Sequence, residues 1–124
     1  MEDDAMQAML TIWVEETAWD GMPQAEQARM LGAYGAYVEA LKAAGVMRGG
    51  ERLAPVAQAA TVRMQGGVPQ VLDGPYAETR EQLGGYFLLE VADMEEAIRW
   101  AARCPGAEHG AVEVRPLWPD PATR

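Results

Sequence analysis

The chain has 124 residues, which is enough for one compact domain and too few for two ordinary ones. Its 19 acidic and 10 basic residues give a formal net charge of −9. This balance repels phosphate backbones, so we expect no nucleic-acid partner. The single cysteine, Cys104, excludes an internal disulfide, and together with the single histidine, His109, it cannot form a zinc site of the usual ligands. We expect no metal and no cofactor.

The distribution of apolar residues indicates a packed domain rather than a membrane segment. No apolar run approaches the roughly 20 residues that a membrane helix requires. Residues 1–4 are acidic, where a signal peptide would be basic. The hydrophobic fraction of 49% favours a buried core. We therefore expect a soluble cytoplasmic protein with one domain over residues 8–118 and loose tails over residues 1–7 and 119–124.

The chain begins with an extended pattern followed by a helical one. Residues 9–14 form a short apolar run with β-branched and aromatic members, which predicts a strand. Residues 15–22 are predicted as a loop. Apolar residues at three- and four-residue steps then predict a helix from Pro23 to near Gly45, which would supply a left-handed cap.

A hairpin signal follows in the middle of the chain. Residues 46–48 are predicted as a short extended piece that the glycines at 49–50 interrupt. Residues 60–64 and 68–72 flank a Gln-Gly-Gly turn, and consecutive glycines supply the positive φ angles of a tight hairpin.

The second half repeats the strand and helix pattern. Residues 77–83 are predicted as a short helical stretch that the glycines at 84–85 end, and residues 86–91 form the strongest predicted strand. Asp93 and Glu96 then have the spacing of a capping box at the start of a second helix. Residues 112–117 are the last predicted strand.

The order of elements is strand, helix, hairpin, strand, helix, strand. This order fits an α+β ferredoxin-like sandwich, in which both helices cover one face of an antiparallel sheet. Strand alternation places the purely aliphatic residues under the helices and a mixed set on the open face. The open-face set comprises Trp13, Tyr86, Leu88, Glu90, Glu113, Arg115 and Leu117.

This open face is too apolar to be left bare on a monomer, so we expect a second copy to cover it as a twofold homodimer. An apolar space with a few polar groups, enclosed between two such sheets, is suited to a small ligand. An alternative is that Glu113 and Arg115 only pair with other charges across the interface, because buried charges need partners with or without a ligand.

One stretch carries a family resemblance. Residues 71–86, which read VLDGPYAETREQLGGY, resemble the signature of YCII-related proteins of the DGPF type, and residues 44–46, 49–55, 97–102 and 112–116 add further matches. The resemblance implies a ferredoxin-like dimeric α/β barrel. It also implies a bacterial family that is often encoded beside extracytoplasmic-function sigma factors and whose biochemical role is largely unassigned.

The sequence departs from the family pattern at two positions, which limits the residue roles that can be transferred from the family to this chain. In the wider YCII family, enzymatic proposals rest on a histidine in the first helix that works with an acidic residue. Here the first helix has no histidine, and Tyr34 stands near the corresponding position, so a histidine-dependent mechanism does not carry over. The usual phenylalanine of the four-residue motif is Tyr76, which adds a hydroxyl.

Asp73 is the foremost catalytic candidate, because a carboxylate beside Gly74 and the rigid Pro75 can act as a general base. It can equally be a turn residue that caps nearby backbone N–H groups. Pro75 should also push Gly74 toward extended backbone values. Glu90 is the second candidate for proton transfer. The candidate ligand-binding residues are Trp13, Tyr76, Tyr86, Glu113 and Arg115.

Three functions are compatible with these residues. The first, which we favour, is a homodimeric small-molecule-binding protein. The second is a cofactor-independent acid–base enzyme acting on a small aromatic or carbonyl compound, in which Asp73 or Glu90 moves the proton and Arg115 holds an anionic group. The third is a dimerisation module without a ligand. The sequence leaves open whether the chain is an enzyme.

Overall fold

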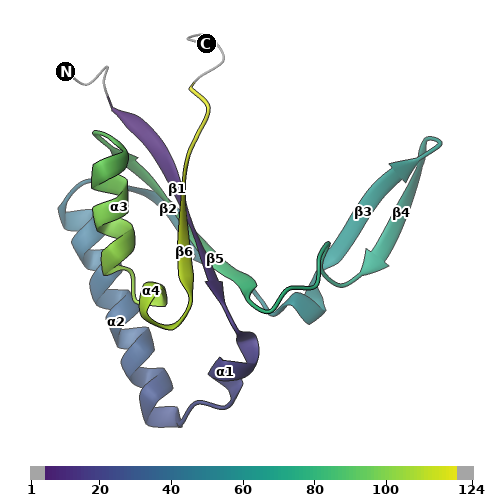
Figure 1. Cartoon of the computed structure of the whole chain (residues 1–124), viewed down its shortest axis with the longest axis horizontal. Coiled ribbons are helices and arrows are strands. Elements are labelled where there is room, and N and C mark those ends of the chain that lie inside the picture. The colour runs from purple at the N-terminus through teal and green to yellow at the C-terminus, as the bar shows by residue number, and fades with distance from the viewer. Residues whose placement is uncertain (1–4, 120–124) are drawn as a thin grey trace.

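The computed structural model describes residues 5–119, with a four-stranded antiparallel sheet, two long helices and a separate two-stranded hairpin (Figure 1). None of the helices in this range is long and apolar enough to cross a membrane. In chain order the elements are β1 (Met6–Val14), α1 (Glu16–Asp20), α2 (Gln24–Ala43), β2 (Met47–Arg52), the 3-10 turn η2 (Val56–Gln58), β3 (Ala60–Gln65), β4 (Val68–Asp73), β5 (Gln82–Val91), α3 (Met94–Arg103), α4 (Gly106–His109) and β6 (Ala111–Pro116).

The sheet has the strand order β2-β5-β1-β6, and all its neighbours are antiparallel. With α2 and α3 on one side, this is the predicted α+β, ferredoxin-like arrangement (Figure 1). The strand that completes the sheet is β2, however, and the predicted hairpin lies outside it. The hairpin is therefore an addition to the ferredoxin-like unit.

The core lies between the sheet and the two long helices. Burial alternates along β1 and β5, so that Leu10 and Leu89 are fully buried while their neighbours face the other side. The Tyr37 hydroxyl donates a 2.7 Å hydrogen bond to the carbonyl oxygen of Trp100 and so joins α2 to α3. Cys104 is buried beside them, as a small apolar residue would be.

The helix ends follow from local chemistry. Glu96 N–H donates to the Asp93 carboxylate at 2.9 Å, and the Glu96 carboxylate accepts from Ala92 N–H at 2.8 Å. Asp93 is therefore confirmed as the N-cap of α3, and the return hydrogen bond to Glu96 comes from Ala92, one residue before the cap. Helix α2 begins after Pro23, and Gly45 follows its end with a φ of +73°, which favours glycine.

Four glycines predicted to break secondary structure lie inside strands. β2 runs through residues 49–50 and β5 through residues 84–85, so residues 77–83 form no helix. The physical reason is close approach: a Cβ at Gly50 would lie 2.6 Å from Phe87 Cδ1, and one at Gly85 would lie 2.8 Å from the Glu51 carbonyl oxygen. The glycines let β2 lie tightly against β5.

Other boundaries were also predicted wrongly. β1 begins at Met6, which pairs with Val91, so Met6 and Gln7 are strand rather than tail. Residues 16–20 form α1 inside the predicted loop, and the single turn α4 was not predicted. Of the predicted tails, residues 1–4 and 120–124 lie outside the described part of the chain.

Two glycine variants test the account of α2. A Cβ at Gly35 would meet nothing within 4 Å, whereas Gly45 has a positive φ. We expect Gly35→Ala to raise the free energy of unfolding by about 0.5–1 kcal/mol, because alanine loses less backbone freedom on helix formation. Gly45→Ala should lower it by roughly 1 kcal/mol or more. Urea unfolding at one protein concentration measures both, and a loss of stability in Gly35→Ala would contradict the account.

Candidate functional site

The face of the sheet opposite the helices carries a row of mixed residues centred on β1. By strand register, Thr11 lies between Tyr86 of β5 and Glu113 of β6, and Met9 lies between Leu88 and Arg115. The β1 and β5 residues of this row are half-buried, and Glu113 and Arg115 are exposed. We call this surface the open face.

Hydrogen bonds join four open-face residues into one group, which we call the open-face cluster: Thr11, Trp13, Glu113 and Arg115. The Trp13 indole Nε1 donates to Thr11 Oγ1 at 3.0 Å, and Thr11 Oγ1 donates to Glu113 Oε1 at 3.1 Å. Arg115 Nη2 donates to Glu113 Oε2 at 3.0 Å. The cluster thus orients an indole, a carboxylate and a guanidinium side by side.

Three of the predicted site residues, Trp13, Glu113 and Arg115, therefore meet in one cluster, and Tyr86 lies beside Thr11 in the register. Thr11 was missed as a site residue, although it links Trp13 to Glu113. Strand alternation could have found it, because it places Thr11 on the same face as Trp13.

The cluster sets the protonation behaviour of Glu113. Its hydrogen bonds, from Arg115 first and Thr11 second, hold the pKa of the Glu113 carboxyl below its ordinary value. These bonds favour the ionised form, so their contribution is complete above the ordinary carboxyl range and is lost as the pH falls through the lowered pKa.

A titration followed by carboxyl carbon NMR tests this arrangement. We expect the Glu113 carboxyl to titrate below an ordinary glutamate, Arg115→Gln to raise its midpoint, and Thr11→Val to raise it less. A midpoint for Glu113 that Arg115→Gln leaves unchanged would contradict the ion pair.

Glu90 lies at one end of the open face rather than in the cluster. Its carboxylate is 3.4 Å from Arg48 Nη2 on β2, and both side chains line a shallow depression with Gly45 and Asp93. Both partners are substantially exposed. Within the single chain, Glu90 is therefore the acidic half of a surface ion pair.

Asp73 and Tyr76 lie away from the cluster, at the base of the β3–β4 hairpin. The Tyr76 hydroxyl accepts a 3.1 Å hydrogen bond from Arg63 Nη2, and the Arg63 guanidinium lies 5.2 Å from the ring centroid. Asp73 ends β4, and within residues 5–119 its carboxylate makes no hydrogen bond or ion pair.

Other groups hold the turn that follows Asp73. Gly74 N–H donates to the Ala59 carbonyl oxygen at 2.7 Å, and Thr61 Oγ1 donates to the Gly74 carbonyl oxygen at 2.9 Å. Gly74 has a φ of +107°, which differs from the ordinary extended values expected before proline and favours glycine. Asp73 is therefore not the residue that caps its own turn.

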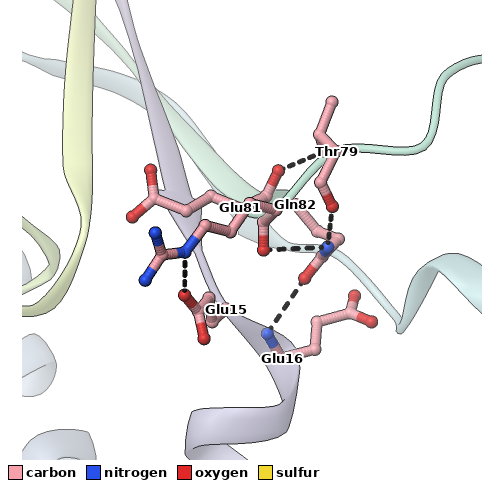
Figure 2. A network of polar contacts seen from close by, with 6 residues as sticks. Glu15, Glu16, Thr79, Glu81 and Gln82 are labelled. Atoms are coloured by element: carbon pink, nitrogen blue, oxygen red, sulfur yellow. Dashed lines mark hydrogen bonds and ion pairs between the residues drawn. The ribbon is translucent and has the colours of Figure 1, made fainter.

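Figure 2 shows a polar network that joins the start of α1 to the segment that follows the hairpin. Glu16 N–H donates to Gln82 Oε1 at 3.0 Å, and the Glu16 carboxylate accepts from Val56 N–H at 3.0 Å. Arg80 Nε lies 2.8 Å from Glu15 Oε1, and Gln82 Nε2 donates to the Thr79 carbonyl oxygen at 2.7 Å (Figure 2). The segments before and after the hairpin are thus both tied to the start of α1.

Tyr34, which stands near the position of the family's helix histidine, does not reach the open face. It packs on the helix side of the sheet, where a Cβ at Gly106 would lie 2.6 Å from its hydroxyl. Burial raises the pKa of Tyr34, and burial also raises the pKa of the nearby Cys104 thiol. Within residues 5–119, no group of three or more His, Cys, Asp or Glu residues is placed to hold a metal ion.

Comparison with known proteins gives two matches. The family model of the YCII-related domain matches residues 6–120. A protein of Rhizobium meliloti (strain 1021), which carries only the name of an uncharacterized protein, is 45% identical over 83 residues, and the match covers 65% of this chain and 64% of that protein. The matched segment thus spans less than two thirds of the relative's own length.

Proposed function

We propose that the chain, which belongs to the YCII-related family, is a homodimer that binds a small molecule against the open face of its sheet. The observation that carries the proposal is the open-face cluster, in which Trp13, Thr11, Glu113 and Arg115 are joined on the face of the sheet opposite α2 and α3. The family resemblance adds an association with extracytoplasmic-function sigma factors, and with it a regulatory role for such binding.

The composition of the open face supports a covering second copy. Met9, Leu88 and Tyr86 form an apolar band beside the cluster, and the long helices α2 and α3 lie on the other face of the sheet (Figure 1). A continuous apolar band at the surface favours association, and twofold pairing is the commonest form that it takes.

The groups that the cluster offers support a particular chemistry for the proposed ligand. The Trp13 N–H is already donated to Thr11, so the indole offers its ring face and edge rather than a free donor. The Arg115 side chain is 72% exposed and uses Nη2 on Glu113, which leaves further guanidinium N–H groups for an anion. A small, largely apolar or aromatic molecule with one carboxylate would match this set of groups.

The acid–base alternative has less support in the single chain. Glu90 is paired with Arg48, and Asp73 lies on the hairpin rather than in the cluster. Binding, rather than proton transfer, is therefore the function that the cluster favours.

Native mass spectrometry of the full chain, purified without denaturant, tests the proposal. We expect a dimer carrying a reproducible small adduct, and loss of that adduct in Arg115→Ala. Arg99→Ala, which removes an exposed arginine from α3, is the matched control and should keep the adduct. A dimer without any adduct would overturn ligand binding, and a monomer would overturn the assembly.

A further inference from the structure

We call the β3–β4 hairpin, residues 60–73, the arm. One of its two faces is apolar along its length, apart from a single carboxylate at the base. Its turn residues Gly66 and Gly67 have φ angles of +59° and +81°, as a tight hairpin requires. Register and strand alternation divide the arm into two faces. The first, which we call the apolar face of the arm, comprises Ala60, Val62, Met64, Pro69, Val71 and Asp73.

No part of the chain within residues 5–119 covers this apolar face. Val62, Met64 and Val71 are each more than half exposed, and every residue of β4 is exposed. Figure 1 shows the arm pointing away from both the sheet and the long helices. An isolated two-stranded ribbon is at best marginally stable in water, so an arm of this length needs a surface to pack against.

The direction of the arm is set by its base. Glu16 binds Val56 on the entering segment and Gln82 on the leaving segment, and Arg80 pairs with Glu15 (Figure 2). Two chain segments anchored to one helix start restrict how the arm can swing. The base therefore holds the arm so that it projects away from the sheet and the long helices (Figure 1).

We propose that the arm of one protomer lies with its apolar face across the open face of its partner and brings Asp73 to the partner's Arg115. Each ligand site would then be built from two chains. This inference rests on the proposed homodimer and adds the composition of the site to it.

The choice of a second copy as occupant follows from complementarity within this one chain. Within residues 5–119 two separate apolar surfaces are left uncovered, the arm and the open face, and a twofold axis would join them twice in a closed dimer. The charges also match. Asp73 shares the face of Val71 and Val62 and has no cation within residues 5–119, whereas the open face exposes the Arg115 guanidinium.

Covering the arm would remove water from the Asp73 carboxylate, so that carboxylate needs a cation in the interface. Arg48 already pairs with Glu90 at the end of the sheet. Arg115 pairs with Glu113, but its side chain is the more exposed of the two. It also lies among the apolar residues of the open face. It is therefore the partner that we assign to Asp73.

Photo-crosslinking in isotopically mixed dimers tests the position of the arm. The full chain, with p-benzoylphenylalanine in place of Val62, is mixed with unmodified ¹⁵N-labelled chain, allowed to exchange subunits and irradiated. We expect crosslinks from position 62 to labelled peptides of β1, β5 or β6. The same group in place of Gln70, on the other face of the arm, is the control and should give few such crosslinks.

Crosslinks only to peptides of the same chain would overturn the proposal, as would crosslinks to the partner's helices. If the protein is dimeric and carries its adduct in either case, the proposed function survives while this inference fails. A monomer would overturn both.

A double-mutant cycle tests the assignment of Asp73 to Arg115. We expect Asp73→Asn and Arg115→Gln each to raise the dimer dissociation constant about tenfold, which corresponds to about 1.4 kcal/mol. The dissociation constant of the double variant should not exceed that of the single variant with the larger dissociation constant, because both changes remove the same contact. Full additivity of the two effects in sedimentation equilibrium would overturn the assignment.

Discussion

Val71→Asp is expected to raise the dissociation constant of the proposed dimer at least about a hundredfold, which corresponds to roughly 2.8 kcal/mol. Val71 lies opposite Val62 at the middle of the apolar face of the arm. If this face packs on the partner's sheet, the new carboxylate would be buried among apolar side chains, while the nearest assigned cation, the partner's Arg115, already pairs with Asp73. Sedimentation equilibrium over a dilution series measures the change.

Gln70→Asp is the matched control for this prediction. Gln70 is the neighbouring residue on β4 and points to the other face of the arm, opposite Arg63. The same charge is therefore introduced one residue away, where we expect little change in dissociation. Equal effects of the two variants would indicate a general charge effect and would contradict the packing of the apolar face.

Gly110→Ala is expected to lower the free energy of unfolding by about 3 kcal/mol, at the upper end of the usual cost of overpacking. Gly110 precedes β6, and a Cβ there would overlap the carbonyl oxygen of Trp13 and lie 3.1 Å from Val14 Cγ1. The obstacle is backbone, which cannot rotate away as a side chain can. The chain can relieve the overlap only by moving β6 from β1.

The same movement would separate Glu113 from Thr11, so Gly110→Ala should also perturb the open-face cluster. Urea unfolding measures the stability, and the Trp13 indole N–H resonance reports the cluster. Gly32→Ala is the control, because a Cβ at that helical position meets nothing within 4 Å. A Gly110→Ala protein as stable as Gly32→Ala would contradict the close packing of β6 on β1.

The fold was predictable where local patterns decide the structure. The spacing of apolar residues placed α2, and Asp93 with Glu96 placed the start of α3. The strand glycines were not predictable, because glycine serves both turns and close approach. Only the long-range contact of Gly50 with Phe87, or of Gly85 with Glu51, decides between these roles.

The residues of the candidate site were also predictable only in part. Alternation and strand order were sufficient to bring Trp13, Glu113 and Arg115 together, because register follows from antiparallel pairing. Asp73 and Tyr76 were placed with them because they belong to the recognisable motif. The motif adjoins an arm that leaves the sheet, and no local pattern in residues 60–76 reveals that separation.

The proposed ligand site requires a second copy of the chain to cover the open face, and sedimentation equilibrium of the unmodified full chain tests this directly. We expect a species of twice the 13.5 kDa chain mass that persists on dilution into the low micromolar range. A single species with the mass of one chain at every concentration would contradict the account, because the open face and the arm would then both be exposed to water.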